Sequence, residues 1–228
     1  MLPPQSITAR YDVVTEHVRA GSCAWSLLAV RDSNLLVDAI TPAQFEADGR
    51  LPYWADLWAS SIAMACALRE GDTLSGKAVL ELGCGLGLAG IAAAQAGANV
   101  TMTDCEPDAV EFARYNAALN LAPDELARVA FRLLDWRDAG AAGAFDLVIG
   151  ADIVYDRELF GTLVACVRRH LAPGGMFLVA DPGRNIGKDF LRLACGEGFA
   201  LSERSVAVTH HGRDLRVTLA GLVRAEAA

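Results

Sequence analysis

A glycine-rich turn between a short apolar run and an alanine-rich segment constrains this chain more than any other feature. The turn carries three glycines at alternate positions, Gly83, Gly85 and Gly87. Glycine suits such a turn because a residue without Cβ can bend sharply while its backbone lies against a ligand. A second apolar run ends in Asp104, whose carboxylate at a neighbouring strand end can accept both hydroxyls of a ribose. The pattern predicts a site for a cofactor that contains a nucleoside.

The register of these glycines separates two classes of cofactor. Residues 85–90 match G-x-G-x-x-G, the dinucleotide fingerprint, but other glycine-rich turns share that pattern. In a dinucleotide site the first glycine follows the apolar strand almost directly, whereas here two residues separate Leu82 from Gly85 and Glu81 places a charge in the strand end. The arrangement E-x-G-x-G-x-G is the pattern of S-adenosylmethionine sites, in which Glu81 can face the amino-acid end of the cofactor. The sequence favours S-adenosylmethionine; a dinucleotide, or a turn that binds nothing, is the alternative.

Composition restricts the class of protein. With 228 residues, 53% hydrophobic and 21% charged, the chain has the size and balance of one globular domain with extensions. No segment is apolar enough to predict a membrane span, and the first residues do not have the pattern of a signal peptide. The net charge of −8 argues against nucleic acid as a partner, because phosphate binding needs clustered lysine and arginine. An acidic protein instead favours a basic substrate.

The cysteines and histidines carry little chemistry of their own. The six cysteines form no C-x-x-C pair and fall mostly within predicted strands and helices, so we expect reduced, buried thiols and a cytoplasmic protein. His210 and His211 lie in a predicted hairpin turn, where we expect them to face solvent. The sequence therefore predicts no metal site.

The chain is predicted to divide into an N-terminal β-rich extension, residues 1–50, and a main domain, residues 51–228. Apolar segments in the extension predict strands near 13–14, 24–30 and 35–37. Thr41-Pro42 predicts the start of a short helix that ends near Gly49. We expect the extension to take part in substrate choice.

In the main domain, a predicted helix at 55–69 is followed by alternating strands and helices. The strands lie near 78–83, 99–103, 128–134, 145–151 and 175–181, and the helices near 87–97, 107–119, 156–171 and 186–196. Continuous apolar runs suit strands covered on both faces, which indicates a parallel sheet. Residues 199–208 and 214–223 predict an antiparallel C-terminal hairpin. The predicted fold class is α/β: a Rossmann-like, seven-stranded, mostly parallel methyltransferase sheet with a small N-terminal β appendage.

Further polar and aromatic side chains fall at the predicted carboxyl ends of the strands, where α/β sheets bind ligands. Trp136 offers an aromatic surface to an adenine, or covers the sheet edge. Asp152 and Tyr155 can point into one cleft, although Asp152 alone would also serve as a helix cap. Trp58, which precedes the sheet, faces either the site or the core, and so does Trp54. Residues 180–184, Ala-Asp-Pro-Gly-Arg, can line the substrate side.

Together these motifs resemble methyltransferase family 16, the seven-β-strand class I protein-lysine methyltransferases. The resemblance covers roughly residues 50 to 185 and rests on Pro52-Tyr53-Trp54-x-x-x-Trp58, Glu81 to Gly87, Asp104, Asp135-Trp136 and Asp152-x-x-Tyr155. The last of these is the D-x-x-Y signature of the family. Ala59 departs from the proline that often follows this tryptophan in relatives.

The resemblance implies a role for each matching position. The cofactor side comprises Trp58, Glu81, Gly83, Cys84, Gly85, Gly87, Asp104, Asp135, Trp136 and Ala151. Within that set, Asp104 would bind the ribose, Trp136 the adenine, and Ala151 the cofactor through its backbone. Asp152 and Tyr155 would stand at the methyl-accepting end as catalytic residues.

The implied reaction is transfer of a methyl group from S-adenosylmethionine to a lysine side chain of a protein substrate, with S-adenosylhomocysteine as the product. A small-molecule N-methyltransferase is the alternative within enzymes, because the fold does not determine the acceptor. A non-catalytic cofactor-binding protein is the alternative outside them, and damage to the glycine turn or to D-x-x-Y, its expected sign, is not seen. The sequence leaves the oligomeric state open.

Overall fold

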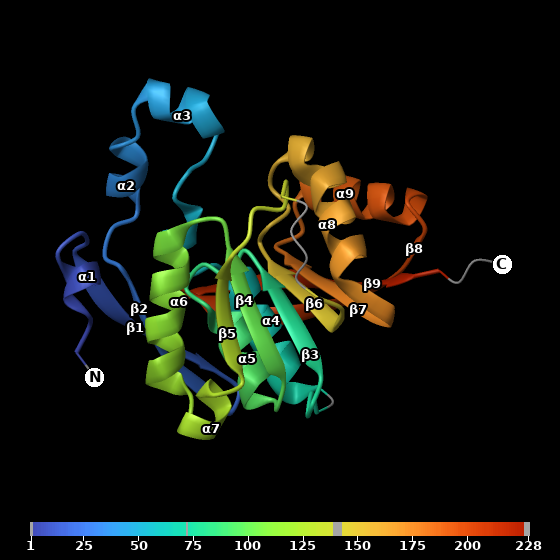
Figure 1. The fold of residues 1–228 in the computed structure, drawn as a ribbon, viewed down its shortest axis with the longest axis horizontal. Helices are drawn as coiled ribbons and strands as arrows, with labels where there is room; N and C mark the ends of the chain where they lie inside the picture. The colour runs from blue at the N-terminus through green and yellow to red at the C-terminus, as the bar shows by residue number, and fades with distance from the viewer. Residues whose placement is uncertain (1, 72, 139–142, 226–228) are drawn as a thin grey trace.

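A seven-stranded sheet forms the centre of the computed structural model, which describes residues 2–71, 73–138 and 143–225 (Figure 1). Its strand order is β5-β4-β3-β6-β7-β9-β8. The strands are β3 (Ala78–Leu82), β4 (Asn99–Asp104), β5 (Val129–Leu133), β6 (Phe145–Ala151), β7 (Leu171–Asp181), β8 (Phe199–His210) and β9 (Arg213–Arg224). β9 runs antiparallel to β7 and β8, and the other neighbouring pairs are parallel. The predicted Rossmann-like sheet with its C-terminal hairpin is confirmed.

Helices cover both faces of this sheet. They are α4 (Ala59–Glu70), α5 (Leu88–Gln95), α6 (Pro107–Asn120), α7 (Pro123–Leu126), α8 (Phe160–His170) and α9 (Asn185–Gly196). One hydrophobic cluster joins the sheet to α4, α5 and α6, and a second joins it to α8 and α9. Alternate residues of β3 serve the two clusters: Val79 belongs to the first, and Leu80 and Leu82 to the second. Burial on both faces explains the continuous apolar runs of the parallel strands.

The strand order creates a crevice at the carboxyl end of β3. From β3 the chain crosses to β4 on one side and later returns through β6 on the other. The connections therefore diverge at the β3/β6 boundary, which is where open α/β sheets bind ligands.

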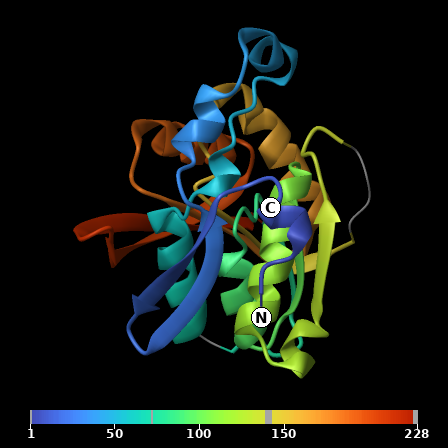
Figure 2. The same cartoon turned by 90° about the vertical axis from the view of Figure 1, so that its left-hand side faces the viewer.

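The N-terminal extension adds a hairpin to the α6 side of the molecule. It comprises α1 (Gln5–Thr8), β1 (Val13–Ala20), β2 (Cys23–Val30), α2 (Asn34–Asp38) and α3 (Pro42–Asp48). β1 and β2 pair only with each other and lie beside α6, while α2 and α3 extend away from the sheet (Figures 1 and 2). The boundary at residue 50 stays a prediction.

Two asparagines of α6 pair with the edge of β2 much as a neighbouring strand would. Asn116 is fully buried; its Oδ1 accepts the Leu28 N–H at 2.7 Å, and its Nδ2 donates to the carbonyl oxygens of Leu28 at 3.1 Å and Leu86 at 3.0 Å. One turn on, Asn120 Oδ1 accepts the Ser26 N–H at 2.9 Å and Nδ2 donates to the Ser26 carbonyl at 2.7 Å. These side chains satisfy backbone groups that a strand edge otherwise leaves unpaired.

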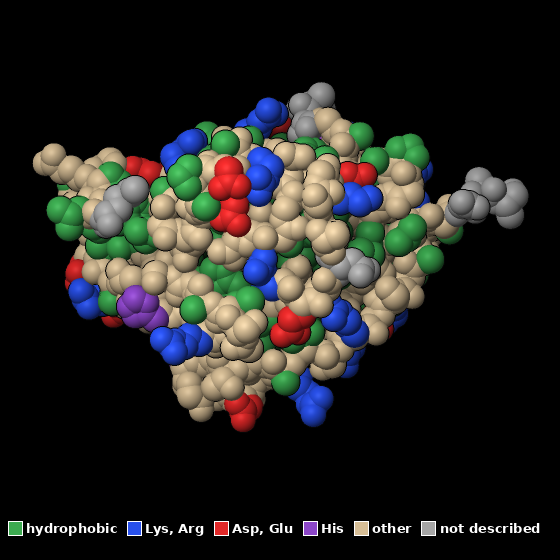
Figure 3. All heavy atoms as spheres, turned by 90° about the horizontal axis from the view of Figure 1, so that it is seen from below, with side chains coloured by type: hydrophobic (Ala, Val, Ile, Leu, Met, Phe, Trp, Pro, Cys, Tyr) green, Lys and Arg blue, Asp and Glu red, His purple; other side chains and the backbone are tan. Residues whose placement is uncertain are grey.

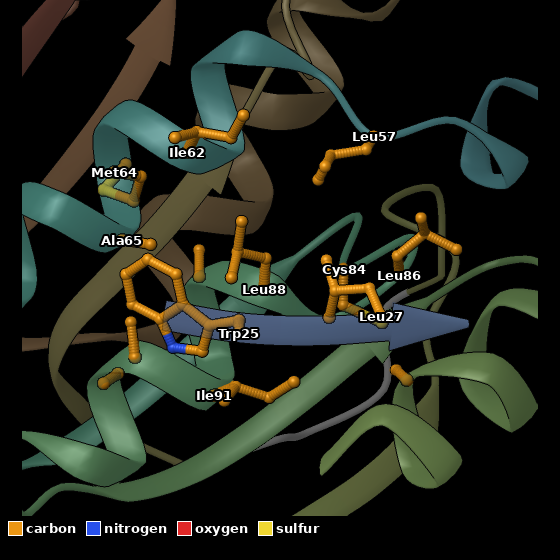
Figure 4. Close-up of a cluster of buried hydrophobic side chains, with 14 of the residues drawn as sticks. Trp25, Leu27, Leu57, Ile62, Met64, Ala65, Cys84, Leu86, Leu88 and Ile91 are labelled. Atoms are coloured by element: carbon orange, nitrogen blue, oxygen red, sulfur yellow. The ribbon is translucent and has the colours of Figure 1, made fainter. Parts of the chain in front are cut away.

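The hairpin also shares the core of the main domain. Trp25 and Leu27 of β2 belong to the hydrophobic cluster that includes α4 and α5. Figure 4 shows the Trp25 ring between Ala65 of α4 and Ile91 of α5, and Leu27 beside Cys84 and Leu86. The Trp25 indole N–H donates to Gln95 Oε1 at 3.0 Å, so the buried ring keeps its hydrogen bond.

Three predictions about local structure were wrong. Residues 35–37 lie in α2, not a strand; three consecutive apolar residues are too short a run to separate the two. The helix expected from residue 55 begins at Ala59, after a 3-10 turn η1 (Tyr53–Ala55), and the one expected from residue 156 begins at Phe160, after η2 (Arg157–Leu159). Of the six free cysteines, only Cys66, Cys84 and Cys166 are buried, and Cys195 is exposed.

The C-terminal hairpin turns at His211 and Gly212, both with positive φ (+47° and +70°), the geometry that two-residue hairpins favour. His210 is half-buried, contrary to expectation, and its Nε2 lies 2.8 Å from the carbonyl oxygen of Leu57. The hairpin tip thus reaches the residue before Trp58.

Charged side chains are dispersed on the side opposite α2 and α3. Seen from below in Figure 3, basic and acidic groups alternate there, and neither sign forms a large patch. Within the described ranges, no helix has the length and apolar character needed to cross a membrane.

Replacing Asn116 with alanine tests the side-chain ladder. Asn116→Ala should lower the free energy of unfolding by about 3 kcal/mol, because buried backbone groups of Leu28 and Leu86 lose their partners. Asn99→Ala, at an exposed position, should change it by less than about 0.5 kcal/mol. Chemical denaturation measures both, and equal stabilities would contradict the ladder.

Candidate active site

A cavity of about 580 Å³ opens at the carboxyl ends of β3, β4 and β6, within the size range of small-molecule sites. All twelve residues predicted for the site line it: Trp58, Glu81, Gly83, Cys84, Gly85, Gly87, Asp104, Asp135, Trp136, Ala151, Asp152 and Tyr155. The structure therefore brings the predicted residues together in one place. Their individual roles stay predictions.

The glycine turn forms the floor of the cavity. Gly83 and Gly85 adopt left-handed φ angles of +63° and +49°, which residues with a Cβ rarely adopt. Space is also restricted, because a Cβ on Gly83 would lie 2.9 Å from Ile153 and one on Gly85 would lie 3.2 Å from the Trp54 carbonyl oxygen. Both conformation and packing therefore require glycine, and the backbone stays open to a ligand.

Asp104 ends β4 beside this turn. Its Oδ2 accepts the Gly85 N–H and its Oδ1 accepts the Glu106 N–H, both at 3.0 Å. Burial raises the pKa of the Asp104 carboxyl, and these backbone donors oppose that rise. A carboxylate has about four acceptor positions, so both oxygens can accept a further hydroxyl each. This is the arrangement that a ribose diol requires.

Glu81 is the most buried ionisable group that lines the cavity, with 3% of its surface exposed. Its Oε2 has no hydrogen-bond partner among the described residues. Burial raises the pKa of Glu81 to about 8, and the backbone N–H of Gly90 offsets only part of the rise. A buried acceptor without a partner, at the wall of a cavity, fits the ammonium group at the amino-acid end of S-adenosylmethionine.

Gly90 explains the partial match to the dinucleotide fingerprint. A Cβ at this position would lie 2.3 Å from Glu81 Oε2 and 2.6 Å from Met102 Cε. Gly90 is therefore glycine because the Glu81 side chain occupies the space between β3 and α5. The third glycine of the pattern has a cause that does not involve a dinucleotide.

Asp135, which also lines the cavity, is held by two arginines. Arg50 Nη2 and Arg137 Nη2 both lie 2.6 Å from Asp135 Oδ2, and Arg137 is the main cause that lowers the pKa of Asp135 to about 2. Because Arg50 follows α3, this ion pair connects the N-terminal extension to the end of β5. Sequence reasoning missed Arg50.

Asp152 and Tyr155 occupy the loop after β6. Asp152 has a left-handed φ of +60°, a conformation that aspartate tolerates better than most residues. Its side chain pairs with Arg184, and 7% of it is exposed. Burial raises the pKa of Asp152, while Ser60 and Arg184 oppose the rise. The helix cap is a different residue, Asp156, whose Oδ1 accepts the Glu158 N–H at 2.9 Å.

Three exposed aromatic rings stand at the rim near Asp152. Tyr53 packs edge-on against Tyr155, with ring centroids 5.4 Å apart, and against Trp58 at 6.0 Å. The Trp58 indole N–H donates to the Tyr53 carbonyl at 2.8 Å. Trp58 therefore belongs to the rim. Trp54 instead packs against Phe112 and Tyr11, with ring centroids 5.3 and 5.7 Å away, although it also reaches the cavity.

Residues 45–194 match the family model described as lysine methyltransferase. The chain belongs to the lysine methyltransferase family. The predicted resemblance to methyltransferase family 16 is confirmed.

Curated relatives share the same region. They include protein N-lysine methyltransferase METTL21A of Danio rerio, 41% identical over 129 residues (55% of this chain, 58% of that protein). EEF1A lysine methyltransferase 3 of Mus musculus is 37% identical over 139 residues (59% and 58%). Electron transfer flavoprotein beta subunit lysine methyltransferase of Rattus norvegicus is 35% identical over 137 residues (58% and 51%). The matched region thus spans little more than half of these relatives.

Solved structures confirm the fold. Magnesium protoporphyrin IX methyltransferase of Synechocystis, crystallised with S-adenosylmethionine, superposes with a TM-score of 0.58 at 21% identity and covers 86% of this chain and 99% of that one. The glycopeptide N-methyltransferase MtfA gives 0.58 at 21% identity, covering 72% and 96%. At these identities, the likeness concerns the architecture.

The high pKa of Glu81 predicts a pH-dependent stability. Folded Glu81 keeps its proton to about pH 8 but loses it near 4.5 when unfolded, so between these values the folded state binds more protons. The free energy of unfolding should therefore fall as pH rises through this window, by at most about 1.4 kcal/mol per pH unit. Glu81→Gln should flatten that slope in denaturation measured at pH 5 to 8. An unchanged slope would mean that Glu81 is ionised in the folded protein.

Asp104→Ala tests the predicted hydrogen bonds between Asp104 and the ribose of the cofactor. The variant should bind S-adenosylhomocysteine at least about tenfold more weakly, because hydrogen bonds to a charged acceptor contribute roughly 1.5–3 kcal/mol each. Titration calorimetry measures the affinity, and Asp124→Ala, at an exposed position in α7, is the control that should match the wild type. Equal affinities would show that Asp104 does not hold the ribose.

Proposed function

We propose that this chain is an S-adenosylmethionine-dependent N-methyltransferase that modifies lysine side chains of a protein substrate. The observation that carries the proposal is that one cavity is lined both by a nucleoside-type carboxylate, Asp104, and by an acceptor-type pair, Asp152 and Tyr155. Membership in the lysine methyltransferase family supports lysine as the acceptor. The names of the curated relatives support a protein as its carrier.

The residues present fit the cofactor. Asp104 would bind the ribose hydroxyls, Trp136 would cover the adenine, and the backbone of the glycine turn would pass beneath. The unpartnered Oε2 of Glu81 would accept from the ammonium group. When bound, S-adenosylmethionine supplies an electrophilic methyl group on a sulfonium centre.

The chain's own contribution to the reaction is alignment and exclusion of water. A lysine must present a neutral amine, because a protonated amine has no lone pair for the methyl group. Asp152 would accept a hydrogen bond from that amine and orient it. The exposed rings of Tyr53, Trp58 and Tyr155 would surround the alkyl stem and stabilise positive charge through their faces.

The charge of the cavity favours a cationic substrate. Its lining carries seven acidic side chains and three arginines. Each arginine pairs with an acid: Arg50 and Arg137 with Asp135, and Arg184 with Asp152. Of the other acidic groups, Glu81 keeps its proton to about pH 8, and the carboxylates of Asp56, Asp104, Asp156 and Glu158 would attract a lysine and repel a nucleic-acid phosphate. Free cysteines are consistent with a cytoplasmic location, which is part of this proposal.

Labelled methyl transfer into host protein tests the proposal. Purified protein with labelled S-adenosylmethionine should modify a protein in lysate of its own host, and mass spectrometry should find methyl-lysine. Asp152→Asn should remove at least about 99% of the label while leaving S-adenosylhomocysteine affinity within a few-fold, because misplacing the acceptor by about 1 Å can cost roughly 10² in rate. Asp124→Asn should label normally.

Other products would overturn parts of the proposal. Label confined to small metabolites would identify a small-molecule N-methyltransferase. Methyl-arginine or methyl-histidine would keep a protein substrate and refute lysine as the acceptor. Full activity of Asp152→Asn would refute the role of the D-x-x-Y loop.

A further inference from the structure

The segment between β7 and α9 is built as one charged unit. Asp181 Oδ1 accepts the backbone N–H groups of Gly183 and Arg184, both at 2.8 Å. Asp181 Oδ2 accepts from Arg184 Nε at 3.1 Å and from Nη2 at 3.0 Å. The guanidinium is therefore fixed at two nitrogens by a carboxylate that is itself fixed to the backbone.

The first turn of α9 packs closely against Asp181. A Cβ on Gly187, in the first turn of α9, would lie 2.7 Å from Asp181 Oδ1. The absence of a side chain there lets the helix approach the carboxylate closely. Asp181 is buried, whereas 35% of the Arg184 side chain stays exposed toward the active-site cavity, which it lines.

Arg184 also reaches the proposed acceptor site. The Nη2 that binds Asp181 forms an ion pair with Asp152 Oδ1. One nitrogen thus bridges two carboxylates that stand at the ends of neighbouring strands, β6 and β7. The Asp152 backbone supports the same arrangement, because its N–H donates to the Ala180 carbonyl at 2.9 Å.

The groups that face Asp152 make its ionisation depend on the Arg184 guanidinium. Asp152 faces Asp181 at the end of β7, Arg184 just before α9, and the neutral hydroxyl of Ser60 in α4. Within its own loop Tyr155 stays a neutral phenol, since burial raises its pKa to about 12. Without the guanidinium, two buried carboxylates would face each other, and one of them would take up a proton.

We propose that Arg184 is a positioning residue that keeps Asp152 ionised and holds it in the direction of the acceptor amine. The nature of that acceptor rests on the proposed function. A bare pair of carboxylates would also retain the lysine as an ammonium ion, which cannot accept a methyl group. Arg184 cancels one of the two negative charges and so favours the neutral amine.

The carboxyl group of Asp152 can be observed directly. Carbon-13 NMR of aspartate-labelled protein, with Asp152→Asn to assign the signal, gives its titration in the wild type and in Arg184→Gln. Loss of the guanidinium should raise the Asp152 midpoint by at least about one pH unit, the lower end of the effect of a close opposite charge. Lys188→Gln, one helical turn further along α9 at an exposed position, is the matched control and should leave the midpoint unchanged.

The rate of methyl transfer supplies the second measurement. In Arg184→Gln, the acidic limb of the single-turnover rate should move to higher pH, with a loss of about tenfold near neutral pH and partial recovery at high pH. Arg184→Lys restores the charge without the two-nitrogen geometry and should rescue part of the rate. S-adenosylhomocysteine binding within a few-fold of the wild type shows that each variant is folded.

The outcomes separate this proposal from the proposed function. An Asp152 midpoint that does not move in Arg184→Gln overturns the positioning role, whatever the protein methylates. A uniform loss of rate with an unchanged pH profile also overturns it, because a purely structural residue gives that result. If the Asp152 midpoint shifts but the protein labels no lysine, the positioning role is supported. In that case only the proposal of lysine methylation is refuted.

Discussion

The hydrogen bond from the Gly85 N–H to the Asp104 carboxylate is the contact on which the rest of the site depends. It joins the glycine turn after β3 to the end of the neighbouring strand β4. A buried carboxylate without donors would become protonated, and the turn supplies a donor because its backbone is not covered by side chains. The same bond fixes where the turn lies, and therefore where α5 begins. This one contact therefore fixes the floor of the cavity, the carboxylate proposed to bind the nucleoside, and the start of α5.

The N-terminal extension is tied to this arrangement at several places, two of which lie on opposite sides of α2 and α3 in the chain. Asn116 and Asn120 bind the edge of β2 on one side, and Arg50 binds Asp135 at the end of β5 on the other. Between these attachments α2 and α3 project beyond the sheet, and Phe45 lines the cavity. The extension therefore contributes a wall of the site as well as part of the core.

The sequence predicted the features that a local pattern of residues encodes, and it did not predict side-chain contacts between residues far apart in the chain. The parallel strands were predictable because burial on both faces leaves continuous apolar runs. The gathering of the twelve predicted residues around one cavity was predictable from the family resemblance and because the carboxyl ends of parallel strands meet at one edge, while their roles stay predictions. Helix α2, which contains residues 35–37, was missed because three consecutive apolar residues are too short a run to separate a strand from a helix. Arg50 and the bridge from Arg184 to Asp152 were missed because a long side chain reaches a partner that spacing along the chain does not reveal. The Asn116 ladder escaped notice for the same reason, since an asparagine in a helix gives no sign of the strand it faces.

Glu81 and Gly90 illustrate how a buried carboxyl group limits which residues a neighbouring position can hold. The carboxylate fills the volume that any side chain at position 90 would need. A side chain at position 90 therefore requires a smaller residue at 81, with the loss of the acid, and a displaced Met102, whose Cε a Cβ at 90 would approach to 2.6 Å. Among descendants of this sequence, a side chain at position 90 would therefore appear only together with changes at positions 81 and 102, which lie on β3 and β4 and are not its neighbours in the chain.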